Sequence, residues 1–226
     1  MTSVSADRTP VASNPEASFR YGAVLAIVLV FVLLEVLSPD AHWSRAVGVG
    51  LASAALSVAI GTSRERAEVR RARTSLFGGI ASLVVIAIWA GLLSDALTFV
   101  VGTLIVAAIP VALGGGVLRL INDSGVTVQA VAGALAIYLV IGMLFASAIG
   151  FVGVVDKPYF TQGKVDNGDV VYYSFTVMTT TGFGDFTAAQ PIGHALAVLE
   201  MLTGQIYLVT VIGILIGNFV GRRARK

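Results

Sequence analysis

Six apolar stretches occupy most of this 226-residue chain, and each is close to the length that a helix needs to cross a lipid bilayer. That length is about 20 mostly apolar residues. Only 12% of the residues are charged, whereas a soluble domain carries about 25%. The sequence therefore predicts an all-α membrane protein with six transmembrane helices, which cover residues 21–37, 46–62, 76–94, 96–118, 126–155 and 191–221.

The basic residues are distributed unevenly between the two sides that six spans would create. Twelve of the 15 Lys and Arg residues fall in the two tails and in the second and fourth connections, and only Arg45, Lys157 and Lys164 fall in the others. Because positively charged segments stay on the cytoplasmic side, both termini are predicted to lie in the cytoplasm of a multi-pass cell-membrane protein. Residues 1–20 are predicted to form a disordered tail, and residues 222–226 a short basic tail.

Between the fifth and sixth spans lies a segment, residues 169–180, that is too short to cross the membrane. Since the flanking spans run in opposite directions, it is predicted to be a re-entrant pore helix followed by a returning loop. Irregular backbone at that depth is tolerated only where protein shields it or where it lines a water-filled path. Gly182 and Gly184 allow conformations denied to other residues, and a row of carbonyls turned one way replaces water around a dehydrated cation.

The residues after this helix, Thr179-Thr180-Thr181-Gly182-Phe183-Gly184-Asp185, resemble the selectivity-filter signature of the potassium-channel family. The resemblance implies that K⁺ is bound by oxygens of Thr180, Thr181, Gly182 and Phe183, with Gly184 at the outer end and Asp185 at the pore mouth. It covers about residues 126–221, which makes this part the pore domain and residues 21–121 a four-helix transmembrane bundle. One such loop cannot enclose an ion and the chain has a single copy, so a homotetramer is expected.

Other positions match the same family. Tyr172 and Tyr173 fall where many members carry a Trp pair on the pore helix, and Thr176 and Thr179 are expected on that same helix. Gly204 falls on the hinge glycine of the inner helix, which is the last span.

The match also has three departures. Thr181 stands where Val or Ile is usual, and it places a hydroxyl group behind the filter. Phe183 replaces the commoner Tyr, so it has no phenolic hydroxyl to anchor the filter wall. The pore helix contains no carboxylate between Val170 and Thr180 to pair with Asp185.

Glu200 lies four residues before Gly204 in the last span. Acids at membrane depth are costly and are commonly functional. Two interpretations remain open: a gating acid that faces a wet cavity, or a structural acid that is hydrogen-bonded to a threonine or tyrosine of the pore helix.

The remaining sequence features argue against steep voltage sensing, catalysis and nucleic-acid binding. The fourth span contains no Lys or Arg, has Pro110 inside it and ends just before Arg119, so it lacks the mobile charge of a steep voltage sensor. There is no cysteine and no catalytic or metal-ligand pattern, so we expect no enzyme and no cofactor besides transported K⁺. The basic residues lack the aromatic interleaving typical of nucleic-acid binding.

The sequence thus predicts a passive potassium-selective channel that is not steeply voltage-gated, with K⁺, the lipid bilayer and its own copies as partners. Two alternatives remain open: a non-conducting scaffold or sensor with a pore-like fold, and a weakly selective cation channel in view of Thr181.

Overall fold

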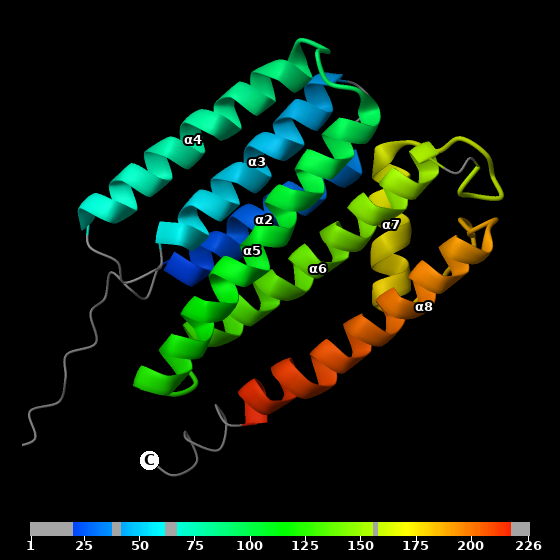
Figure 1. Ribbon diagram of the computed structural model, residues 1–226. Helices are drawn as coiled ribbons and strands as arrows, with labels where there is room; N and C mark the ends of the chain where they lie inside the picture. The colour runs from blue at the N-terminus through cyan, green and yellow to red at the C-terminus, as the bar shows by residue number, and fades with distance from the viewer. Residues whose placement is uncertain (1–19, 38–41, 62–66, 156–157, 218–226) are drawn as a thin grey trace, which may run out of the picture.

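The computed structural model describes residues 20–37, 42–61, 67–155 and 158–217 of the chain. Long helices run side by side, and one short helix, α7, is set between the last two of them (Figure 1). The predicted tails lie outside the described residues, except for Arg20. The helices are α2 (Arg20–Leu37), α3 (His42–Gly61), α4 (Ala67–Trp89), α5 (Asp95–Ser124), α6 (Val128–Val155), α7 (Asn167–Met178) and α8 (Pro191–Ile206), which continues into a π-helical segment, η1 (Tyr207–Ile212).

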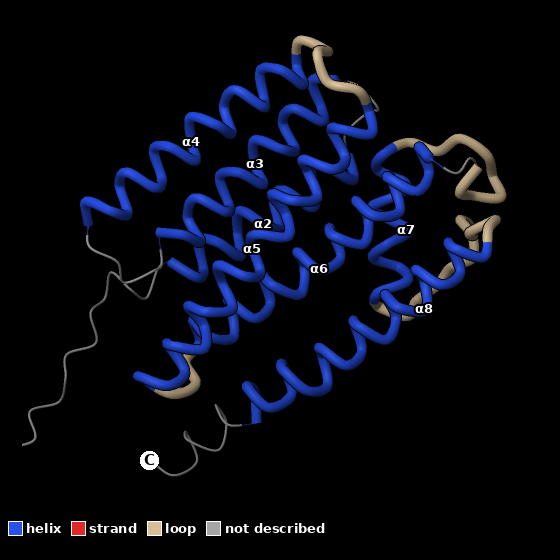
Figure 2. Tube along the Cα trace, viewed as in Figure 1, coloured by secondary structure: helices blue, strands red, loops and turns tan. Residues whose placement is uncertain are grey.

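Helix accounts for nearly all of the regular structure in the described part of the chain (Figure 2). The β pairing there consists of isolated bridges that join Phe160 to Gly163 and to Ala188. The all-α prediction is therefore confirmed for these residues.

Three helices are long and apolar enough to cross a membrane, namely Ala96–Asn122, Val128–Val155 and Pro191–Gly217. Three shorter apolar helices, Tyr21–Leu37, Arg45–Ile60 and Ser75–Trp89, have 10–17 residues each. At a rise of about 1.5 Å per residue, such lengths fall somewhat short of a hydrocarbon core about 30 Å thick. The described residues therefore support a membrane protein, and the count of six spans stays a prediction.

Two predicted helix boundaries were wrong. α4 begins at Ala67, so the backbone of Arg70, Arg71 and Arg73 is helical and does not form a loop. α5 continues to Ser124, well past its predicted end at residue 118, and the N–H of Gly125 closes it by donating to the carbonyl of Ile121. Arg, Ala and Leu are good helix formers, so helical structure extends beyond the apolar part of each span.

One continuous hydrophobic core joins α2, α3, α5, α6 and α7. Its fully buried side chains include Val24 and Val28 of α2, Ile109 of α5 and Val140 of α6. α6 lies between α5 on one side and α7 and α8 on the other (Figure 1). α2 and α5 therefore rest on the same helix that supports α7, whereas α3 packs on α2 and α5, and α4 packs on α3.

α8 approaches the end of α7 so closely that only glycine fits at the contact. A Cβ atom at Gly204 would lie 2.4 Å from the carbonyl oxygen of Met178. Small residues allow this kind of close helix approach in membrane proteins. The π-helical segment begins three residues later, at Tyr207, so the departure from α-helical geometry lies just beyond the predicted hinge glycine.

Gly204→Ala should therefore destabilise the protein, because an added methyl group must push the backbone of Met178 away. Overpacking of this kind costs about 1–3 kcal/mol. The matched control is Gly217→Ala, since nothing lies within 4 Å of a Cβ atom there. Thermal unfolding in detergent should show a lower melting temperature for Gly204→Ala than for Gly217→Ala, and equal melting temperatures would contradict the close contact.

Candidate functional site

The helix α7 and the segment that follows it form a hairpin whose two ends meet. The side chain of Gln162, just before α7, donates from Nε2 to the carbonyl of Asp185 at 2.6 Å. Nearby, the N–H of Thr161 donates to the carbonyl of Thr187 at 2.9 Å. The chain thus enters along α7 and returns to the same end of the molecule (Figure 1).

The N-terminus of α7 is held by two carboxylates from different elements. The Asp169 carboxylate accepts from the N–H of Asp166, the residue that caps the helix, at 3.2 Å. Glu35 of α2 accepts from Nδ2 of Asn167 at 2.7 Å. Negative charge at a helix N-terminus is favourable, and Gly168 allows α2 to come close, since a Cβ atom there would lie 2.4 Å from the carbonyl oxygen of Val36.

The returning backbone alternates in handedness. Thr180, Gly182 and Gly184 have φ angles of 58°, 52° and 81°, whereas Thr181 and Phe183 are not in the positive-φ region. Positive φ suits the two glycines, but for a β-branched threonine it is strained by about 1–3 kcal/mol. An alternation of this kind is compatible with successive carbonyls that point the same way, which stays a prediction from the glycine positions.

The strained residue Thr180 is held from two sides. Its N–H donates to the carbonyl of Val177 at 2.9 Å, and its hydroxyl oxygen accepts from Nε2 of Gln205 on α8 at 3.2 Å. Sequence reasoning missed Gln205, although an amide side chain directly after Gly204 in an apolar helix was a visible signal.

A second set of hydrogen bonds fixes the start of the loop to the end of α7. The N–H groups of Thr181 and Gly182 both donate to the carbonyl of Thr176, at 2.9 and 3.1 Å. The Thr179 hydroxyl donates to the carbonyl of Phe175 at 2.7 Å and lies 2.9 Å from the hydroxyl of Thr181. Because the single proton of Thr179 is already used, Thr181 is the donor between them, and its unusual hydroxyl is satisfied.

Tyr172 is the partner of Asp185 on α7 that the sequence did not reveal. Its ring stacks on Phe183 with the ring centroids 6.3 Å apart and the planes at 1°. Its hydroxyl is hydrogen-bonded to the Asp185 carboxylate, and this bond raises the pKa of the Tyr172 hydroxyl above its ordinary value. The pore helix therefore does partner Asp185, through a phenol instead of a carboxylate.

Tyr173 faces the other way and is part of the buried support. It packs edge-on against Phe160 with the centroids 5.0 Å apart and against Tyr159 at 6.3 Å.

The boundary of the predicted pore helix also differs from the prediction, because α7 ends at Met178 and Thr179 is its C-cap.

Glu200 is fully buried. Its Oε1 atom lies 2.5 Å from the hydroxyl oxygen of Ser174 in α7. The partner is thus in the pore helix, as the structural interpretation expected, but it is a serine and not a threonine or tyrosine. A residue with no exposed surface does not face a wet cavity in the single chain.

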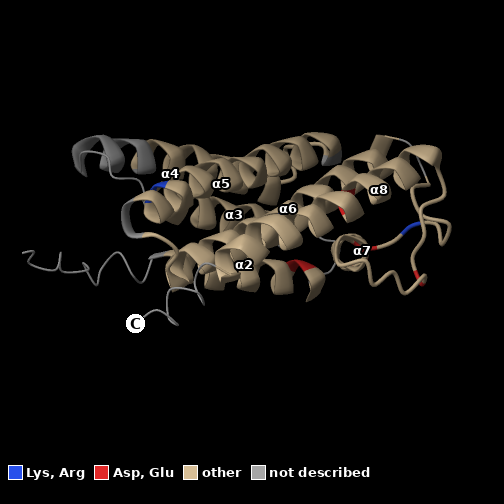
Figure 3. Ribbon diagram, turned by 90° about the horizontal axis from the view of Figure 1, so that it is seen from below, with Lys and Arg blue, Asp and Glu red and all other residues tan. Residues whose placement is uncertain are grey.

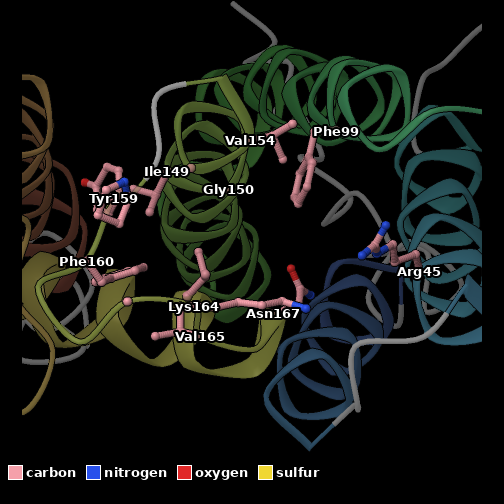
Figure 4. Close-up of a pocket in the computed structure, with 14 residues that line it drawn as sticks. Arg45, Phe99, Ile149, Gly150, Val154, Tyr159, Phe160, Lys164, Val165 and Asn167 are labelled. Carbon is pink, nitrogen blue, oxygen red and sulfur yellow. The ribbon is translucent and has the colours of Figure 1, made fainter.

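A cavity of about 450 Å³ lies between the N-terminal bundle and α7 (Figure 4). Arg45 and Phe99 line it from the bundle side, and Lys164 and Asn167 line it from the α7 side (Figure 4). None of its lining residues comes from the loop 180–184. That loop is exposed on the surface of the single chain, where Phe183 is 68% exposed.

Residues 133–220, which contain most of α6, α7, the loop and α8, match the family model described as "ion channel". No curated protein and no solved structure matched the chain. The match covers less than half of the chain and supports an ion channel in a membrane, and it points to a channel rather than to an enzyme.

Tyr172→Phe should weaken the outer end of the loop, because Asp185 loses its partner while the ring stack with Phe183 remains. Ionic current through the variant should decline severalfold faster during sustained recording. Tyr173→Phe is the matched control, since that hydroxyl belongs to the contact with Tyr159. An equal decline in both variants would show that the bond between Tyr172 and Asp185 does not support the loop.

Proposed function

We propose that this chain is one subunit of a potassium-selective channel that conducts K⁺ passively through a homotetrameric pore. The observation that carries the proposal is the alternating φ along the loop from Thr180 to Gly184. In the proposed pore, the K⁺ ligands are the carbonyl oxygens of this loop with the Thr180 hydroxyl at the inner end, and Asp185 lies at the outer mouth. Such oxygens replace the water that an ion loses on entry.

The proposed tetramer is supported by two surfaces that the single chain leaves exposed. The loop residues 179–185 are exposed, and so is an apolar face of α8, which includes Leu199, Leu202 and Ile206 at 56%, 55% and 60% exposure. Four loops around one axis are needed to surround an ion. Fourfold assembly would bury the loop and bring the four α8 helices together, with the remaining apolar surfaces against lipid.

The proposed orientation in the cell membrane places α7 as a re-entrant helix on the outer side. The start of α2, the start of α4 and the end of α5 lie at the same end of the molecule as the end of the helical segment that follows α8 (Figure 1). These segments carry basic residues, including Arg20, Arg70 and Arg119. Several acidic residues lie toward the other end, near α7 and its loops (Figure 3), so the positive-inside rule favours cytoplasmic termini and six spans.

A weakly selective cation channel is the second candidate function. Thr181 favours it, because a hydroxyl replaces the usual apolar side chain in the filter wall. The hydrogen bond between Thr181 and Thr179 instead favours a rigid wall, since it removes the free polar group. A non-conducting scaffold with a pore-like fold would give no current at all.

The reversal potential in a potassium gradient against sodium tests the proposal and separates these candidates. A selective pore reverses near the potassium potential and a weakly selective one near zero. Gly184→Ala should abolish selectivity, because its φ of 81° strains any residue with a Cβ atom. Gly115→Ala is the control, since nothing lies within 4 Å of a Cβ atom there. Unchanged selectivity in Gly184→Ala would overturn the assignment of the filter.

Opening should depend only weakly on voltage. Steep sensors move about 3–4 charges per subunit, whereas Arg119 is the single Lys or Arg in α5. The α5 helices of four subunits could then move about four charges at most, against about 12 or more in a steep sensor. Open probability against voltage in symmetrical potassium measures this quantity, and an effective gating charge of about 10 would contradict the prediction.

A further inference from the structure

The hydroxyl of Ser174, in the middle of α7, lies between two oxygen atoms from two other helices. One is the carbonyl oxygen of Gly142 in α6, at 2.8 Å, and the other is Oε1 of Glu200 in α8, at 2.5 Å. Ser174 and Glu200 both have no exposed surface. Water is therefore not available to rearrange these contacts.

The number of protons that these contacts need decides whether Glu200 is neutral or ionised. A serine hydroxyl has one proton to donate, and a backbone carbonyl can only accept. The geometry allows Ser174 to donate either to the Gly142 carbonyl or to Glu200, but one proton cannot serve both contacts. Both contacts can be hydrogen bonds only when the proton of Ser174 serves Gly142. The contact between Ser174 and Glu200 then needs a second proton, and only Glu200 can supply it.

We infer that Glu200 is a neutral carboxylic acid that donates its proton to Ser174 and so positions the pore helix α7 between α6 and α8. The protonation of Glu200 does not depend on the proposed channel function. Only its effect on conduction rests on that function. A chain of two hydrogen bonds, from Glu200 to Ser174 and from Ser174 to Gly142, joins the three helices that surround the filter loop.

The surroundings of Glu200 also favour the neutral acid. Among the described residues, the titratable side chains on which Glu200 acts electrostatically are Tyr138 of α6, Tyr173 of α7 and Tyr159 of the preceding loop, and all three are phenols. On α8 itself, His194 lies 2.9 Å from the carbonyl oxygen of Ala188. Oε2 of Glu200 has no hydrogen-bond partner among the described residues, and an unpaired buried oxygen is far less costly in a neutral acid than in a carboxylate.

The position of the cluster links it to conduction. Ser174 lies directly before the last turn of α7, and in that turn the carbonyl of Thr176 accepts from the N–H groups of Thr181 and Gly182. Loss of the Glu200 proton would remove one hydrogen bond and leave a buried charge, so α7 would move and the loop with it. Since the folded assembly holds a proton that the unfolded chain releases, raising the pH weakens the assembly.

The infrared spectrum of the full-length protein in lipid vesicles tests the chemistry directly. At neutral pH, wild type should show the carbonyl-stretch band of a protonated carboxyl group, and one component of it should be missing from Glu200→Gln. Glu35→Gln is the matched control, because it removes the other buried carboxyl group and should keep that component. An identical band in wild type and Glu200→Gln would overturn the inference, whether or not the protein conducts.

Potassium flux from the same vesicles tests the positioning role. A glutamine amide donates to Ser174 at any pH, so Glu200→Gln should conduct like wild type at neutral pH and keep its flux at alkaline pH, where wild type loses it. Ser174→Ala should lower the flux about tenfold at neutral pH, since it leaves the buried acid without an acceptor. Equal loss of flux in wild type and Glu200→Gln as the pH rises would refute the role of Glu200, and absence of flux from all proteins at every pH would refute the proposed channel function alone.

Discussion

In the proposed pore, a run of backbone carbonyls must be kept free for an ion, and the rest of the structure depends on this constraint. At membrane depth, irregular backbone survives only where protein shields it or where it lines a water-filled path. In the proposed pore, the loop from Thr180 to Gly184 leaves its oxygens for K⁺, so it cannot hold itself together by the regular hydrogen bonds of a helix. Other elements must fix its conformation.

The short helix α7 provides most of that support, and its own position is set from three sides. At its end, the carbonyl of Thr176 receives two N–H groups of the loop. In its middle, Ser174 bonds to α6 and α8, and at its start Asn167 bonds to α2. The N-terminal bundle thus reaches the loop by two routes: α2 and α5 pack on α6, and α2 packs directly on the start of α7, where Asn167 donates to Glu35. A change in the bundle therefore has a physical route to the loop.

The residue of the loop with the most strained backbone, Thr180, also receives an additional hydrogen bond from α8. The positive φ angles of Gly182 and Gly184 cost little, but that of Thr180 does not. Thr180 receives an additional hydrogen bond from Gln205, and this amide follows directly after the glycine that lets α8 approach Met178. The close approach at Gly204 and the bond from Gln205 therefore depend on each other: the first brings α8 near enough for the second.

The sequence alone determined the all-α architecture, the position of the short helix and the unusual backbone at Gly182 and Gly184, because hydrophobic length and glycine spacing are local properties, but it did not indicate the positive φ of Thr180. It misplaced the ends of α4 and α5, since helix formation continues past the apolar residues that mark a span. It did not reveal that Tyr172 pairs with Asp185, that Gln205 reaches Thr180 or that Glu200 meets Ser174. Only the tertiary structure decided these pairs, because each joins residues 13 to 26 positions apart, or a side chain to a loop whose course the packing of α7 against α6 and α8 sets.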